Sequence, residues 1–210
     1  MEASDVAAVL LDMDGTLVDS DAAVERAWTA WAAEHGVDPA AALRIAHGAP
    51  AATTVRRLLP HLGGAAIARS AARQLALQYE DLGEVGPLPG AHDLLAVLDD
   101  LGLPWAVVTS ADARLAAARL GAADIVAPIL VTADDVPRGK PDPDPFLAGA
   151  AALGVEPTRC LVVEDSVPGL AAGRAAGMRT AALRGLDGDL RIRDLAHLAH
   201  VLRRSRRMPP

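Results

Sequence analysis

Two carboxylates separated by one residue follow the first apolar run of the chain. Residues 6–11 are typical of a short buried strand, and Asp12 and Asp14 come directly after it. Side chains two positions apart at a strand end point the same way, so both carboxylates can face one pocket. Two negative charges so close repel each other unless a cation or a shared proton offsets the repulsion. The pair therefore predicts a metal site, a proton-sharing pair, or both.

A second acidic pair follows another apolar run. Glu164 and Asp165 come after residues 161–163, which are again typical of a strand. In an open parallel sheet, ligands bind outside the carboxyl ends of the strands, so we expect the two acidic pairs to meet there. Four oxygen-bearing acids favour a hard divalent ion, and Mg²⁺ fits best because it tolerates few protein ligands and keeps waters for a phosphate. The candidate metal ligands are Asp12, Asp14, Glu164 and Asp165.

Lys140 is the only lysine in the chain, since the other 19 of the 20 basic residues are arginine. A compact ammonium serves a phosphoryl oxygen as a point charge, whereas the forked guanidinium is larger and geometrically more demanding. Lys140 lies between Gly139 and Pro141 in a predicted loop, which favours a functional role over a chance survival. It is not a P-loop lysine, because Pro141 stands where Ser or Thr is required and the spaced glycines are missing.

Thr109 and Ser110 end a third apolar run and precede a helix that we expect to start near Asp112. Hydroxyl and backbone N–H groups at such a junction can hold an anion, helped by the helix dipole. Helix capping without a ligand explains the two residues equally well. Both interpretations stay open at this point.

The elements that must position these residues form an alternating pattern. Short apolar runs alternate with helical periodicity, which predicts an α/β fold with a Rossmann-like parallel sheet covered on both faces. The predicted strands are residues 6–11, 105–108, 129–131, 161–163 and 180–183. The predicted helices are residues 91–101, 112–120, 145–153 and 168–176, and each is followed by a glycine that can end it.

One long segment breaks the alternation. Residues 21–82 contain no convincing strand and instead show several helical patterns, the first of them starting near Asp19 to Asp21 and ending at Gly36. We therefore predict an inserted helical-bundle cap over residues 20–86. Residues 1–19 and 87–210 form the α/β catalytic core. The crossings near residues 19–21 and 86–90 are the predicted hinges.

Composition limits the partners and the setting. The chain has 210 residues, 51% hydrophobic side chains and a net charge of −7, which argues against disorder and against a nucleic-acid partner. With Cys160 as its one cysteine it can form no internal disulfide, which favours a reducing, cytoplasmic location. The apolar run near its N-terminus is too short for a membrane segment, so no membrane partner is expected. The basic residues 203–207 are interpreted as a solvated terminus.

The quoted residues, in this order, resemble the four motifs of the haloacid dehalogenase (HAD) superfamily. The motifs are Asp12-Met13-Asp14-Gly15-Thr16, Thr109-Ser110, Gly139-Lys140-Pro141-Asp142-Pro143 and Val163-Glu164-Asp165-Ser166. The helical insertion is similar to the small cap of that superfamily. A further set resembles its sugar and hexitol phosphatases and the related β-phosphoglucomutases: Asp19, Val24-Glu25-Arg26-Ala27-Trp28, Trp31, His35-Gly36 and His47-Gly48.

The resemblance implies a role for each matching residue. Asp12 is the implied nucleophile, and Asp14 the general acid that later serves as base. Thr109, Ser110 and Lys140 would hold the phosphoryl oxygens. Mg²⁺ would be bound by Asp12, Asp165 and the carbonyl of Asp14, with Glu164 acting directly or through water. In the cap, His47 and Gly48 are implied to contact substrate, although a solvated loop explains His47 about as well.

The function predicted from these residues is Mg²⁺-dependent hydrolysis of a small sugar or polyol phosphate monoester through an aspartyl-phosphate on Asp12. Two alternatives remain, a sugar phosphomutase similar to β-phosphoglucomutase and a non-catalytic regulator that binds a sugar phosphate. The mutases carry a histidine where Val24 stands, which favours hydrolysis, and an intact nucleophile argues against a mere binder. Dehalogenases lack the second aspartate, which is present here as Asp14. A monomer or a weak homo-oligomer is expected.

Overall fold

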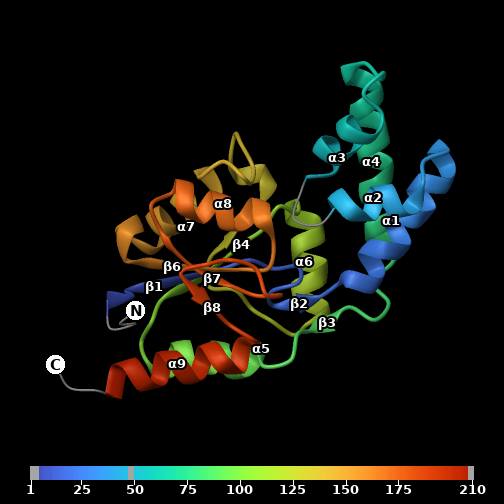
Figure 1. The fold of residues 1–210 in the computed structure, drawn as a ribbon. Coiled ribbons are helices and arrows are strands. Elements are labelled where there is room, and N and C mark those ends of the chain that lie inside the picture. The colour runs from blue at the N-terminus through green and yellow to red at the C-terminus, as the bar shows by residue number, and fades with distance from the viewer. Residues whose placement is uncertain (1–4, 47–49, 208–210) are drawn as a thin grey trace.

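The computed structural model describes residues 5–46 and 50–207 and places a six-stranded sheet at the centre of the larger part of the molecule (Figure 1). The strand order is β5-β4-β1-β6-β7-β8, and all pairings in this sheet are parallel. The strands are β1 (Ala8–Leu11), β4 (Trp105–Val108), β5 (Leu130–Val131), β6 (Cys160–Glu164), β7 (Arg179–Ala182) and β8 (Leu190–Arg191). The predicted α/β class with a Rossmann-like parallel sheet is confirmed.

The central strands are buried on both faces, which explains why they are continuous apolar runs and not alternating patterns. Every residue of β1, β4 and β6 is buried. In the register of the sheet, Leu11 of β1 lies opposite Val107 of β4 and Val163 of β6. The next residue of each strand therefore emerges at the same edge of the sheet.

Helices cover both faces of the sheet (Figure 1). On one face, α5 (Ala91–Asp100), α6 (Ala113–Ala122) and α9 (Leu195–Arg207) share an apolar cluster with Val9, Leu11 and Leu161. On the other face, α7 (Asp144–Leu153) and α8 (Val167–Ala175) pack against Leu10 and Val162. Two 3-10 helices in the core part of the chain are η2 (Ala133–Asp135) and η3 (Pro157–Arg159).

The segment predicted as an insertion folds into four helices that lie beside the sheet (Figure 1). They are α1 (Asp21–His35), α2 (Pro39–Ala46), α3 (Ala51–Leu58) and α4 (Gly64–Glu80). These helices have an apolar cluster of their own, centred on Trp28 and Trp31, and the Trp31 indole donates to Ser70 of α4. The chain enters and leaves them through β2 (Val18–Asp19) and β3 (Gly86–Pro87), which pair antiparallel.

Some local details differ from the predictions for identifiable reasons. The short ribbon of β2 and β3 at the two crossings was not predicted, because two-residue strands leave no periodic signal, and the predicted hinges there stay a prediction. Gly121 lies inside α6 and does not follow it. The basic residues Arg203, Arg204 and Arg206 are exposed, as expected of a solvated terminus, but they belong to helix α9, which extends to Arg207 and buries Leu195, Leu198 and Leu202 in the core.

None of the helices among the described residues has the length and apolar character needed to cross a membrane.

Candidate active site

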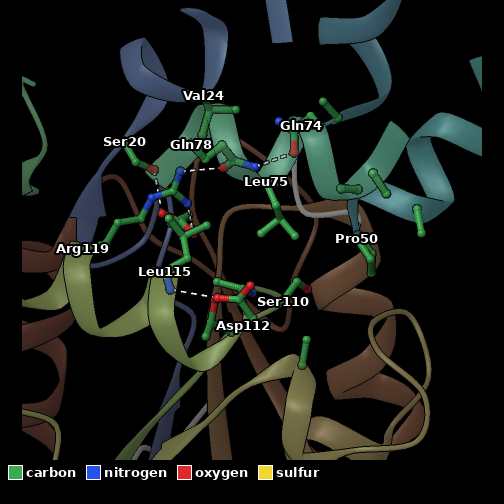
Figure 2. A pocket seen from close by; sticks show the side chains of 18 of the residues that line it. Ser20, Val24, Pro50, Gln74, Leu75, Gln78, Ser110, Asp112, Leu115 and Arg119 are labelled. Atoms are coloured by element: carbon green, nitrogen blue, oxygen red, sulfur yellow. Dashed lines mark hydrogen bonds and ion pairs between the residues drawn. The ribbon is translucent and has the colours of Figure 1, made fainter. Parts of the chain in front are cut away.

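Acidic, hydroxyl and basic side chains meet where β1, β4 and β6 end. Asp12 follows β1, Thr109 follows β4, and Glu164 is the last residue of β6. Asp12 and Thr109 line a cavity of about 460 Å³ that continues between the sheet edge and the helices α1, α3 and α4. Figure 2 shows Gln74 and Gln78 of α4 on one side of this cavity and Ser110 and Asp112 on the other.

The Lys140 ammonium ties two of the strand ends together. Its Nζ donates to Asp12 Oδ1 at 2.5 Å, to Glu164 Oε1 at 2.7 Å and to the backbone oxygen of Val108 at 2.9 Å. An ammonium has three N–H donors, so these contacts engage all of them. The Lys140 side chain is 1% exposed, which removes competing water from the three hydrogen bonds. The lone lysine thus lies in the acidic cluster and binds two carboxylates directly, and its predicted contact with phosphoryl oxygens stays a prediction.

Two carboxylates share this one ammonium, and burial and the neighbouring charges change pKa values within the cluster. Burial and the neighbouring Glu164 raise the pKa of Asp12 well above its usual range, although Lys140 opposes the shift. Burial and Glu164 also raise the pKa of Asp165 to about 7, with Arg184 opposing. Burial by itself lowers the pKa of Lys140, but the charges of Asp12 and Glu164 outweigh it and leave that pKa above its ordinary value. Three carboxylates, those of Asp12, Glu164 and Asp165, thus contact two cationic side chains, Lys140 and Arg184.

Glu164 is fully buried and both of its oxygens are engaged. Oε1 accepts from Lys140, and Oε2 accepts from the backbone N–H groups of Asp165 and Ser166 and from the Ser166 hydroxyl. Room for this carboxylate exists because residue 169 of α8 is glycine, since a Cβ there would overlap the Glu164 carboxyl group. Glu164 thus fixes Lys140 and the start of α8 at the same time.

Three of the predicted metal ligands come close enough to bind one ion. One carboxylate oxygen each from Asp12, Glu164 and Asp165 can be chosen so that all three lie within 4.8 Å of one another. The set contains only oxygen donors, which suits a hard cation such as Mg²⁺. Burial and the neighbouring Glu164 raise the pKa of both Asp12 and Asp165, and a divalent cation bound here would favour their ionised forms. The donor set therefore fits Mg²⁺.

The Asp14 carboxylate lies outside this group and is held by two other donors. Ser20 Oγ donates to Oδ1 at 2.7 Å, and Arg119 Nη1 lies 2.7 Å from Oδ2. Gly15 allows the turn between the two aspartates, because its φ of +78° belongs to the left-handed region and a Cβ would overlap Asp165. Ser20 occupies the N-cap position of α1, but its hydroxyl donates to Asp14 and makes no capping hydrogen bond to the helix.

Thr109 and Ser110 both line the cavity, but their hydroxyls are used differently. Thr109 Oγ1 accepts from the backbone N–H of Ala111, which is a local turn contact. The buried Ser110 hydroxyl has no partner within the described ranges 5–46 and 50–207. Asp112 caps α6 by accepting from Leu115 N–H. Capping is thus done by Asp112, which leaves Ser110 free for a ligand.

His47 and Gly48 lie outside the described residues, so their predicted contact with substrate stays a prediction. The residues that flank this segment, Ala46 and Pro50, both line the cavity.

Comparison with known proteins agrees with the motif resemblance. A family model described as haloacid dehalogenase-like hydrolase matches residues 6–177. The chain belongs to this family. Hexitol phosphatase A of Escherichia coli (strain K12) is 41% identical over 194 residues, which cover 92% of this chain and 90% of the relative. An N-acetylmuramic acid 6-phosphate phosphatase of Pseudomonas aeruginosa is 36% identical, with 84% and 81% of the two chains covered.

Solved structures also share the fold. The crystal structure of a hydrolase from Pseudomonas syringae superposes with a TM-score of 0.85 at 28% identity, covering 95% of this chain and 98% of the other. The predictions that the chain is an enzyme of the hydrolase class and resembles the HAD sugar phosphatase group are therefore confirmed. The names of its curated relatives agree with the predicted class of phosphoric monoester hydrolase.

Sequence reasoning missed two arginines that complete the site of this HAD-like hydrolase. Arg184, which follows β7, lies 2.8 Å from Asp165 and 2.9 Å from Asp21 at the start of α1. The rule that ligands gather at the carboxyl ends of strands would have pointed to it. Arg119 lies within α6 and is buried, and no sequence signal distinguishes it from the other arginines.

We predict that Lys140→Arg lowers kcat for phosphate release from p-nitrophenyl phosphate by at least about 100-fold, because a buried ion pair with spoiled geometry loses on the order of 3 kcal/mol. The guanidinium is too large to direct three short hydrogen bonds at the same three oxygens. The matched control is Arg138→Lys, an exposed residue two positions earlier, which should keep normal turnover. Ordinary kinetics for Lys140→Arg would show that the three contacts are dispensable.

Gly169→Ala tests the packing behind Glu164. The added methyl group must displace the Glu164 carboxylate, so we expect a loss of about 1–3 kcal/mol in the free energy of unfolding together with reduced turnover. Gly121→Ala in α6 is the control, since a Cβ there has nothing within 4 Å and alanine favours a helix. Denaturant unfolding and phosphate release measure the two effects. Equal stability of both variants would contradict the close fit at residue 169.

Proposed function

We propose that this hydrolase removes the phosphoryl group from a small sugar or polyol phosphate monoester, with Mg²⁺ as cofactor and an aspartyl-phosphate on Asp12 as intermediate. The observation that carries the proposal is the placement of Asp12. Its carboxylate is held by Lys140 at 2.5 Å, lines the cavity and belongs to the three-carboxylate group that fits a cation. A nucleophile held beside a metal site and open to a cavity suits attack on phosphorus.

In the first step, an Asp12 carboxylate oxygen forms a bond to phosphorus while the bond to the leaving sugar oxygen breaks. Asp14 acts as general acid and gives a proton to that oxygen. The buried contact with Lys140 favours the ionised Asp12 that must attack and fixes its orientation. When bound, Mg²⁺ supplies positive charge that offsets the phosphoryl oxygens and the acidic cluster. Ser110, with its free hydroxyl, and Thr109 are proposed to hold phosphoryl oxygens.

In the second step, a water oxygen forms a bond to phosphorus while the bond from the Asp12 oxygen to phosphorus breaks. Asp14 accepts the proton of that water, so phosphate is released and both aspartates return to their starting state. Ser20 and Arg119 keep Asp14 in place for both proton transfers. Asp14 contributes its backbone carbonyl to the ion in this proposal, and Glu164 contributes directly or through water. Because Lys140 and the start of α8 already engage the Glu164 oxygens, contact through water suits it well.

The helices α1–α4 are proposed to be the cap, with residues 20–86 as one domain and residues 1–19 and 87–210 as the catalytic core. The cavity between them and the sheet edge is large enough for a sugar-sized leaving group. Relatives named as hexitol phosphatase and N-acetylmuramic acid 6-phosphate phosphatase support a sugar or polyol phosphate as substrate. Val24 lines the cavity where the mutases carry histidine, which supports hydrolysis over phosphomutase activity. A cytoplasmic monomer or weak homo-oligomer, with no nucleic-acid or membrane partner, completes the proposal.

The proposed function predicts that the purified protein releases phosphate from a hexitol phosphate, that excess chelator abolishes the activity and that Mg²⁺ restores it. Asp12→Asn should lower kcat by at least about 1,000-fold while circular dichroism stays unchanged, because an amide keeps the shape but does not attack phosphorus. Asp124→Asn, an exposed residue with φ of +53° that asparagine tolerates, is the control. Full activity in chelator, or normal kcat for Asp12→Asn, would refute the mechanism.

A further inference from the structure

Three polar side chains form a hydrogen-bonded chain along the wall of the cavity (Figure 2). Arg119 Nη2 of α6 donates to Gln78 Oε1 at 2.7 Å, and Gln78 Nε2 donates to Gln74 Oε1 at 2.7 Å. Both glutamines belong to α4, one helical turn apart. The hydrogen-bonded chain thus runs from Arg119 of α6, which holds Asp14, to Gln74 of α4.

The direction of this chain is set by chemistry. A guanidinium only donates hydrogen bonds, so the group of Gln78 that faces Arg119 must be its oxygen. The Gln78 amide nitrogen then faces Gln74 and requires an oxygen there, which leaves the Gln74 NH₂ group as the end of the chain. Whatever completes the chain beyond Gln74 must accept a hydrogen bond.

No protein acceptor for that NH₂ group is found within residues 5–46 and 50–207. Gln74 is fully buried, and the lining of the same cavity includes the apolar side chains of Ala71, Leu75 and Trp28. A buried donor without a partner costs about 1–3 kcal/mol, so the position favours a ligand that brings an oxygen. The nitrogen Nε of Arg119, on the same wall, also lacks a partner among these residues.

We propose that Gln74 determines substrate specificity by donating a hydrogen bond from its NH₂ group to a hydroxyl oxygen of the leaving group. This inference rests on the proposed phosphatase function and assigns the recognition of a hydroxyl group of the sugar or polyol to one residue of α4. A site built to donate to a substrate oxygen discriminates strongly against an analogue that lacks the oxygen, because the donor then stays buried and unpaired. Arg119 and Gln78 act as positioning residues, since they hold the Gln74 amide in this orientation.

The test compares two phosphate esters, glucitol 6-phosphate, which carries hydroxyl groups, and phenyl phosphate, whose leaving group has no oxygen besides the ester oxygen. Gln74→Leu should lower kcat/KM for glucitol 6-phosphate by at least about tenfold, which corresponds to about 1.4 kcal/mol, and leave phenyl phosphate within about twofold. Gln74→Met, of similar length and also without an amide, should behave in the same way. Leu75→Met on the same wall is the control and should leave the ratio of the two substrates unchanged.

The outcomes separate the two proposals. A ratio of kcat/KM values that stays constant in both Gln74 variants, whether the two substrates fall together or neither falls, would overturn the specificity role and leave the phosphatase function intact. No phosphate release from either ester by the unmodified protein with Mg²⁺ would overturn the proposed function and this inference with it. Loss confined to the hydroxyl-bearing ester supports both.

Discussion

The buried contact of the Lys140 ammonium with Asp12 and Glu164 is the interaction on which the site depends. It joins residues that lie 128 and 24 positions from Lys140 in the chain, and it does so at the ends of two adjacent strands. Removing one partner from such a buried ion pair leaves an uncompensated charge and lowers the free energy of unfolding by about 3–5 kcal/mol. Each of the three side chains therefore depends on the other two. The parallel register of β1, β4 and β6 places the three acceptors of Lys140 at one edge of the sheet, and the fit of Glu164 against Gly169 fixes the group from behind.

Two arginines extend this ordered centre toward the helices α1–α4. Arg184 joins Asp165 to Asp21 of α1, and Arg119 joins Asp14 to Gln78 of α4. Asp165 and Asp14 are therefore each linked through one guanidinium to a helix of the α1–α4 group. The position of these helices and the orientation of the acids are consequently coupled, because moving a helix changes the partners of its arginine.

The sequence was sufficient to predict the sheet and the acidic residues because both follow one rule: buried parallel strands are apolar runs, and functional side chains come directly after them. This rule identified Asp12, Thr109 and Glu164, and the scarcity of lysine identified Lys140. It did not reveal that Lys140 binds the carboxylates, because contacts between distant strand ends depend on three-dimensional register. Gln74 and Gln78 on an amphipathic helix look like ordinary polar positions until the cavity beside them is known.

The proposed mechanism makes Asp12, held by Lys140, the nucleophile whose carboxylate oxygen attacks phosphorus. The most direct measurement is to stop the reaction with hexitol phosphate during steady-state turnover, reduce the protein with borohydride and sequence the peptide around residue 12 by mass spectrometry. Reduction of an aspartyl-phosphate yields homoserine. The proposed mechanism therefore predicts homoserine at position 12 in samples stopped during turnover and aspartate at that position in samples without substrate. Aspartate at position 12 during full turnover, with homoserine at another position or nowhere, would contradict the account.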